Sequence, residues 1–177
     1  MIRKSALLSV CLVASLACFG RAGDTKTDAV TLRQLTWADF QKHLASTKDA
    51  KFTIVDAWAT TCGPCKQNFP HLVEMYHKYG DKGLAVVSLS LDDYEDSKAV
   101  ADAEKFLREK KATFTNVLLK EEFGVGFDKL NISAIPAVFL YGPDGKEIAR
   151  FTMEDVDNQF TYEQVEKDVR QRLGVSN

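Results

Sequence analysis

The chemistry that this sequence could perform is concentrated in the segment Cys62-Gly63-Pro64-Cys65. The segment lies where a strand-like run meets an amphipathic helical pattern, so the thiol of Cys62 is expected at a helix N-terminus. Unpaired backbone N–H groups and the positive end of the helix dipole lower the pKa of a thiol there. Because the thiolate is the reactive form in disulfide exchange, Cys62 is the predicted nucleophile and Cys65, one helical turn inward, is the predicted resolving thiol. Pro64 falls in the first turn, where its missing N–H is not needed.

Other uses of a cysteine pair fit the sequence less well. A structural disulfide across so short a loop removes little entropy from the unfolded chain. Haem attachment would require His after the second cysteine, where Lys66 stands, and a peroxidatic thiol would require Thr at the position of Ala59. His71 and His77 lack the spacing of paired zinc ligands and are expected on a helix surface. We therefore expect neither a metal nor another cofactor.

The other two cysteines, Cys11 and Cys18, lie in a predicted export signal over residues 1–22. A basic start is followed by an apolar run too short to span a bilayer comfortably, and small residues precede a cleavage position after Ala22. Cleavage removes three Lys and Arg and leaves 20 against 25 Asp and Glu, so the formal charge changes from −2 to −5. A lipoprotein anchored through Cys18 is the alternative, because Leu16-Ala17-Cys18 is similar to the end of a lipoprotein box.

Residues 23–177 are expected to form one domain, because no repeat, linker or low-complexity tract divides them. Strand and helix patterns alternate in the order βαβαβαβαββα, which predicts a mixed sheet flanked by helices. The turn residues of 142–145 favour a hairpin, and Thr161 and Gln164 have capping-box spacing at the start of the last helix. The expected strands are 30–35, 52–55, 84–91, 113–119, 137–141 and 146–152, and the helices begin near Trp37, Cys62, Asp96, Phe127 and Thr161.

The segment from Val55 to Lys66, which reads Val-Asp-Ala-Trp-Ala-Thr-Thr-Cys-Gly-Pro-Cys-Lys, resembles the active-site segment of thioredoxin. Pro70 matches the proline inside the active-site helix of that family, and Ile135-Pro136 is similar to its cis-proline loop. The strand, helix and strand over 84–119 resemble the insertion of exported thiol-disulfide oxidoreductases of the TlpA/ResA type. The resemblance implies an α/β thioredoxin fold, a central mixed sheet flanked by helices, with a strand-helix insertion in its centre.

The resemblance also assigns roles to residues around the cysteines. Asp56 corresponds to a buried carboxylate that helps to deprotonate Cys65, and burial would raise its pKa; a surface carboxylate is the alternative. A cis peptide bond at Pro136 would let the backbone of Ile135 pair with an extended substrate. The implied substrate-binding residues are Trp58, placed beneath the active-site turn, together with Gly63, Pro64, Ile135 and Pro136.

Three positions depart from the family pattern. Thr61 replaces a Trp that often precedes the first cysteine, and Gly63 stands where ResA-type members carry Glu. The cytochrome-maturation specificity of those members is therefore not supported at this position. Ser88 or a neighbour takes the place of the Lys that pairs with the buried Asp in thioredoxin.

Together these residues predict an exported thiol-disulfide oxidoreductase that acts on protein disulfides as a monomer. A Gly-Pro dipeptide offers no cation or extra donor to over-stabilise the thiolate, which favours a reductant or isomerase. The resemblance implies a membrane-bound thiol reductase as electron donor. The alternatives are a non-catalytic thioredoxin-fold module that binds extended polypeptides and a protein that delivers metal through the cysteine pair. The near-balanced charge argues against a nucleic-acid partner.

Overall fold

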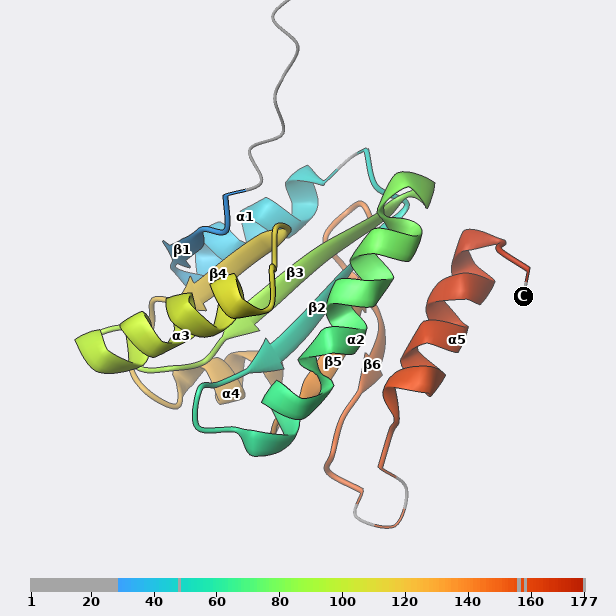
Figure 1. The fold of residues 1–177 in the computed structure, drawn as a ribbon. Coiled ribbons are helices and arrows are strands. Elements are labelled where there is room, and N and C mark those ends of the chain that lie inside the picture. The colour runs from blue at the N-terminus through green and yellow to red at the C-terminus, as the bar shows by residue number, and fades with distance from the viewer. Residues whose placement is uncertain (1–28, 48, 156, 158, 177) are drawn as a thin grey trace, which may run out of the picture.

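The computed structural model describes residues 29–47, 49–155, 157 and 159–176, so the predicted export signal and Cys18 lie outside the described residues. Strands and helices follow the predicted order around one six-stranded sheet (Figure 1). The strands are β1 (Leu32–Leu35), β2 (Phe52–Trp58), β3 (Leu84–Ser90), β4 (Thr115–Leu119), β5 (Ala137–Tyr141) and β6 (Glu147–Phe151). The helices are α1 (Trp37–Ser46), α2 (Gly63–Tyr79), the 3₁₀ helix η1 (Gly80–Lys82), α3 (Ser97–Glu109), α4 (Val125–Leu130) and α5 (Tyr162–Leu173).

The sheet is mixed and has the strand order β1-β4-β3-β2-β5-β6. The first four strands in this order are parallel, β5 is antiparallel to β2, and β6 is antiparallel to β5. The segment α3-β4 lies near the middle of the element order along the chain, and it places β4 between β1 and β3 in the sheet. β2, which leads into the cysteines, lies inside the sheet and is buried along its whole length.

Helices cover both faces of the sheet, as parallel strands require. α2, α3 and α5 pack on one face, and α1 and α4 pack on the other (Figure 1). Alternation along β2 sends Ile54 and Trp58 into the core under α2, whereas Val55 and Ala57 enter the opposite core. Asp56, between them, therefore points to the face that carries α2 and α5.

Several boundaries differ from those expected from sequence. β1 and β4 each begin two residues later than expected. β2 continues to Trp58, which pairs with the last residue of β3, and α4 begins earlier than expected, at Val125. At Gly80 the backbone changes from α to 3₁₀ geometry, and the chain turns at Gly83, where φ is +105° and a side chain would be strained. Val73 and Tyr76 of α2 are partly buried at the edge of the core.

No helix within the described residues is both long and apolar enough to cross a membrane.

Candidate active site

Cys62 and Cys65 form a disulfide at the junction of β2 and α2, with Cα atoms 5.3 Å apart. Cys62 is the N-cap of α2, and the backbone N–H of Cys65 donates to its Sγ at 3.2 Å. Cys65 is 1% exposed, whereas Cys62 is partly exposed. The predicted placement of the pair at a strand–helix junction is confirmed, and Cys62 is the sulfur that a substrate could reach first.

A buried carboxylate holds the loop that leads to Cys62. Asp92, just beyond β3, accepts the backbone N–H of Thr60 at 2.9 Å and its hydroxyl at 2.6 Å. The hydroxyl of Ser90 donates to the other carboxylate oxygen at 2.7 Å. Asp92 was not singled out from the sequence, although an Asp directly after a buried strand is a signal that could have indicated it.

Asp56 is buried on the sheet face that carries α2 and α5, with 1% of its surface exposed. The alternative of a surface carboxylate is therefore wrong. The hydroxyl of Tyr162, the first residue of α5, donates to Asp56 Oδ2 at 2.8 Å. Burial raises the pKa of Asp56 to about 7, and the hydrogen bond from Tyr162 opposes this rise because it stabilises the carboxylate.

Ser88 is the register neighbour of Asp56 on β3, yet it is not the partner of that carboxyl. Its hydroxyl donates to Asn116 Oδ1 at 2.9 Å, and the Asn116 amide in turn donates to backbone carbonyls around the start of β4. The position of the family's Lys is thus occupied by a separate neutral network. Tyr162, which sequence reasoning missed, supplies the hydrogen bond to Asp56 instead.

The peptide bond between Ile135 and Pro136 is cis, as the resemblance implied. The carbonyl oxygen of Ile135 lies 3.7 Å from Cys62 Sγ, so this loop and the disulfide are neighbours in space although 73 residues separate them in sequence. Pro136 is buried and Ile135 is partly exposed. The loop runs directly into β5, whose pairing with β2 sets its position next to Cys62.

The other predicted site residues divide between surface and core. Gly63 and Pro64 are exposed at the start of α2, and no atom would lie within 4 Å of a Cβ added at Gly63. Trp58 is completely buried, with its ring 5.5 Å from that of Phe69 and 5.0 Å from that of Phe106. It therefore supports the site from beneath and lies away from the surface that a substrate would meet.

The histidines of α2 do not form a metal site within the described part of the chain. His71 stacks on Tyr162 with ring centroids 5.6 Å apart, whereas His77 is exposed on the helix surface. No group of three or more His, Cys, Asp or Glu side chains that could hold a metal ion occurs among the described residues.

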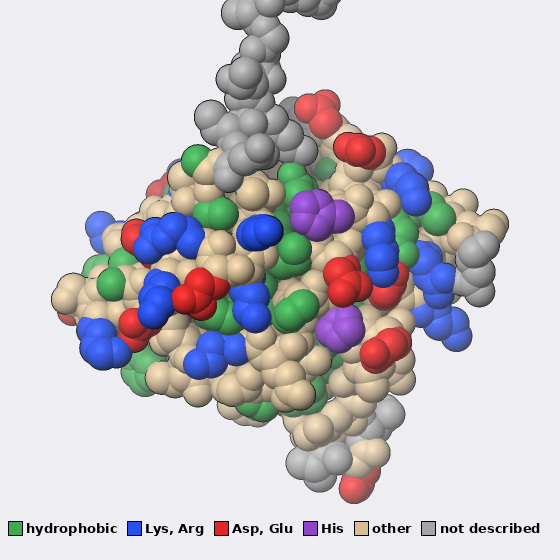
Figure 2. All heavy atoms as spheres, in the orientation of Figure 1, with side chains coloured by type: hydrophobic (Ala, Val, Ile, Leu, Met, Phe, Trp, Pro, Cys, Tyr) green, Lys and Arg blue, Asp and Glu red, His purple; other side chains and the backbone are tan. Residues whose placement is uncertain are grey.

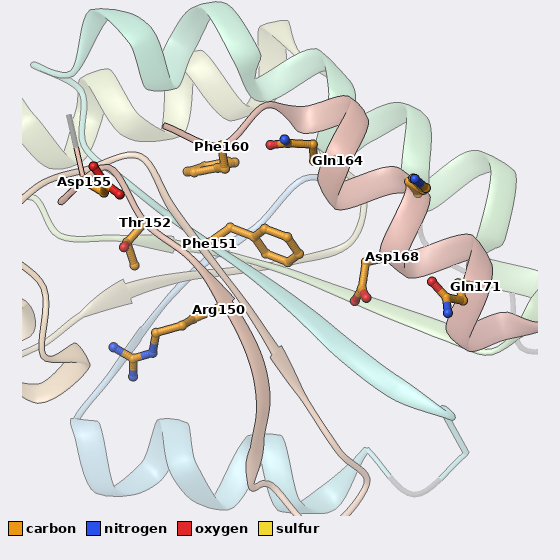
Figure 3. A pocket seen from close by; sticks show the side chains of 9 residues that line it. Arg150, Phe151, Thr152, Asp155, Phe160, Gln164, Asp168 and Gln171 are labelled. Atoms are coloured by element: carbon orange, nitrogen blue, oxygen red, sulfur yellow. The ribbon is translucent and has the colours of Figure 1, made fainter. Parts of the chain in front are cut away.

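Two grooves lie near these elements. One, of about 300 Å³, borders the active-site loop and is lined by Thr60, Thr61, Lys66, Asp102, Lys105, Phe106 and Glu109. The other, of about 530 Å³, lies between β6 and α5, and Phe151 and Phe160 are among the residues that line it (Figure 3). The second groove is larger, but neither cysteine, nor Asp56, nor the Ile135 loop lines it, so the candidate site is the disulfide end of α2.

Comparison with known proteins gives a family match that includes Cys62 and Cys65. The model of the AhpC/TSA family matches residues 26–150. The thiol-disulfide oxidoreductase ResA of Oceanobacillus iheyensis is 30% identical over 127 residues, which are 71% of this chain and 62% of that protein. ResA of Bacillus subtilis is 28% identical over 98 residues, which are 55% of this chain and 51% of that protein. The chain thus spans less than two thirds of the length of these relatives.

Solved structures show the same fold. A Chlorobium tepidum protein assigned as the thiol:disulfide interchange protein DsbE is 31% identical, with a TM-score of 0.57 and coverage of 73% of this chain and 84% of that one. The thioredoxin domain of a thiol-disulfide oxidoreductase from Bacteroides vulgatus is 28% identical, with a TM-score of 0.52 and coverage of 69% and 81%. The predicted thioredoxin fold is confirmed.

Proposed function

The chain belongs to the AhpC/TSA family, and we propose that it is a thiol-disulfide oxidoreductase that exchanges disulfides with proteins through Cys62 and Cys65. The observation that carries the proposal is the asymmetry of the pair: Cys62 is partly exposed at a helix N-terminus, and Cys65 is buried one turn inward. The names of the ResA relatives and of the DsbE-like structure support the same activity. Ala59 stands where a peroxidatic thiol would need Thr, so disulfide exchange is proposed in preference to peroxide reduction.

The reduced protein acts in two exchange steps. The Cys62 thiolate attacks one sulfur of a substrate disulfide, forming a mixed disulfide and releasing the other substrate sulfur as a thiolate. Cys65 then loses its proton to Asp56 and attacks Cys62 Sγ, which forms the Cys62–Cys65 disulfide and releases the second substrate sulfur. The substrate gains two electrons and the cysteine pair loses two.

The helix N-terminus favours the first step. The N–H of Cys65 aims at Cys62 Sγ, and the macrodipole of α2 adds positive potential at the same place, so negative charge on Cys62 is stabilised. The backbone carbonyl of Ile135 lies 3.7 Å from Cys62 Sγ, and the backbone there offers groups to an extended substrate. Gly63 and Pro64 present no bulky side chain that would obstruct it.

We assign the direction of exchange to reduction or isomerisation. Gly63 and Pro64 contribute no charged group next to Cys62, so nothing in the dipeptide over-stabilises the thiolate. In equilibration with glutathione or dithiothreitol we expect a reduction potential near that of thioredoxin, about −270 mV. A value near that of DsbA, about −120 mV, would contradict this direction. A membrane-bound thiol reductase is the proposed donor that returns the pair to the dithiol.

Replacement of the resolving cysteine tests the catalytic proposal. In Cys65→Ser the mixed disulfide cannot be resolved, so substrate proteins should stay linked to Cys62 and be recovered by non-reducing electrophoresis and mass spectrometry. The double variant Cys62→Ser/Cys65→Ser is the matched control and should capture nothing. Equal recovery with both variants would show that binding does not depend on the thiol and would favour the non-catalytic binding module.

A further inference from the structure

The two oxygens of the Asp56 carboxyl have different surroundings. Oδ2 accepts the hydroxyl of Tyr162 at 2.8 Å. Oδ1 is buried and has no hydrogen-bond partner among the described residues. A carbonyl oxygen accepts a hydrogen bond better than the hydroxyl oxygen of a carboxylic acid does, so the phenol favours the form in which the acid proton is on Oδ1.

The position of the Tyr162 hydroxyl is set by elements on both sides of it. Thr161 and Gln164 form a complete capping box that holds the first turn of α5. The Tyr162 ring stacks on His71 of α2 with centroids 5.6 Å apart and contacts Phe160 at the same separation. Tyr162 therefore connects α5 and the cysteine-bearing helix to the carboxyl of β2.

The register neighbours of Asp56 on the two adjacent strands carry no charge. β3 contributes Ser88, which is hydrogen-bonded to Asn116, and β5 contributes the apolar Val138 in register with Asp56. From α2, His71 stacks on the ring of Tyr162. Burial is the larger influence on the pKa of Asp56 and raises it, and the hydrogen bond from Tyr162 lowers it.

We propose that Tyr162 is a positioning residue for the resolving step: its hydroxyl holds Oδ2 of Asp56 and makes Oδ1 the atom that takes the proton of Cys65. This inference rests on the proposed function for its catalytic meaning. The proton passes from the Cys65 thiol to Oδ1, the Cys65 thiolate attacks Cys62 Sγ, and the substrate sulfur leaves as a thiolate. Loss of the hydroxyl leaves Asp56 in place but frees both oxygens and destabilises the carboxylate.

The test is the titration of Asp56 itself, monitored through the ¹³C chemical shift of its carboxyl carbon in the oxidised protein. In Tyr162→Phe the midpoint should rise by about one pH unit, because a hydrogen bond to a charged group is worth about 1.5–3 kcal/mol and one pKa unit corresponds to 1.36 kcal/mol. The rate of the resolving step should fall as the pH is lowered through this midpoint. In Tyr162→Phe the fall should therefore occur at a higher pH than in the wild type. An unchanged midpoint would overturn the proposal.

Tyr79→Phe is the matched control. It removes a similar hydroxyl, which donates to Glu166 of α5 at 2.7 Å and also links α2 to α5, but Asp56 keeps its own donor. Its midpoint for Asp56 should equal that of the wild type, and a shift as large as that of Tyr162→Phe would count against a specific role for Tyr162. If Tyr162→Phe does not fold, 3-fluorotyrosine at position 162, a stronger donor, should lower the midpoint, and an unchanged or raised value contradicts the proposal.

The NMR titration needs no substrate, so it separates this inference from the proposed function. A shifted midpoint in Tyr162→Phe together with an empty Cys65→Ser trap would reject the catalytic proposal and leave the control of Asp56 by Tyr162 intact. A filled trap with an unshifted midpoint would reject the role of Tyr162 alone.

Discussion

At the scale of single residues, the proposed chemistry depends on groups whose surroundings make them unequal. The cysteines differ in exposure and in the N–H aimed at Cys62, and the two oxygens of Asp56 differ in hydrogen bonding. An Asp with a pKa of about 7 can accept a proton near neutral pH and release it again, which an exposed carboxyl with a pKa near 4 does poorly.

Burial of Asp56 should lower the stability of the protein as the pH rises. The unfolded carboxyl has a pKa of about 3.9, so between about pH 4 and pH 7 the folded state holds a proton that the unfolded state has lost. The free energy of unfolding should therefore fall over this window by up to roughly 4 kcal/mol and then level off. In Asp56→Asn this part of the decline should be absent, as urea unfolding of the oxidised protein at several pH values can measure.

The control for this measurement is Asp128→Asn, which changes an exposed carboxyl of α4. It should keep the wild-type slope. Parallel curves for wild type and Asp56→Asn would show that burial of Asp56 does not govern the pH dependence.

At the scale of elements, strand ends and loops bring the site together. β2 carries Asp56 and Trp58 towards α2, and the loop after β2 is held by the carboxylate of Asp92. The loop before β5 brings Ile135 to Cys62, and the first turn of α5 brings Tyr162 to Asp56. These contacts join β2 and the loop after it to the segments that flank β3 and β5 and to α5. A shift of any of these elements would therefore change the geometry around the disulfide.

Close packing of α4 gives a prediction at this scale. A Cβ at Gly126 would lie 2.9 Å from side-chain carbons of Leu91 and Leu119, whereas a Cβ at Gly63 would have no atom within 4 Å. Gly126→Ala should destabilise the fold by about 1–3 kcal/mol through overpacking. Gly63→Ala, also in a helix, should be neutral or slightly stabilising because Ala favours helix by up to about 1 kcal/mol. Urea unfolding of both variants checks this, and equal stabilities would contradict the packing argument.

At the scale of the whole molecule, the described residues form one sheet with a helical layer on each face. Basic and acidic side chains are interspersed on the face that carries α2, α3 and α5 (Figure 2). Among the described residues of that face, the charges create no broad area of one sign. Recognition of a substrate is therefore expected to depend on the backbone near Ile135 and on the accessible sulfur more than on long-range electrostatic attraction.

Export is proposed for the molecule as a whole and has a direct test. Signal cleavage after Ala22 would produce a chain that begins at Gly23, carries a formal charge of −5 and retains Cys62 and Cys65 as its two cysteines. Intact mass measurement and N-terminal sequencing of protein from the envelope of the native host should find this form. A chain that begins at Cys18 with an attached lipid would instead establish the lipoprotein route, and an uncleaved cytoplasmic chain would contradict export.

Local patterns in the sequence are sufficient to predict the elements and the reactive pair. The alternation in the strands, the helical periodicity and the capping box of Thr161 and Gln164 each involve neighbours within a few residues, and the structure confirms the order of elements that they predict. The resemblance of the segment around Cys62 to thioredoxin predicted the fold and the buried acid. The errors lie at element ends, where pairing with a distant strand decides where a strand begins.

By itself, the sequence determined that two thiols stand at a strand–helix junction, because spacing and periodicity are properties of adjacent residues. Only the tertiary structure decided that Tyr162, 106 residues from Asp56, is the partner of that acid, and that Asp92 holds Thr60 of the active-site loop. Such contacts depend on strand order and register and on how each helix crosses the sheet. These arise when the whole core packs, and the residues that make the contacts carry no local pattern that identifies their partners.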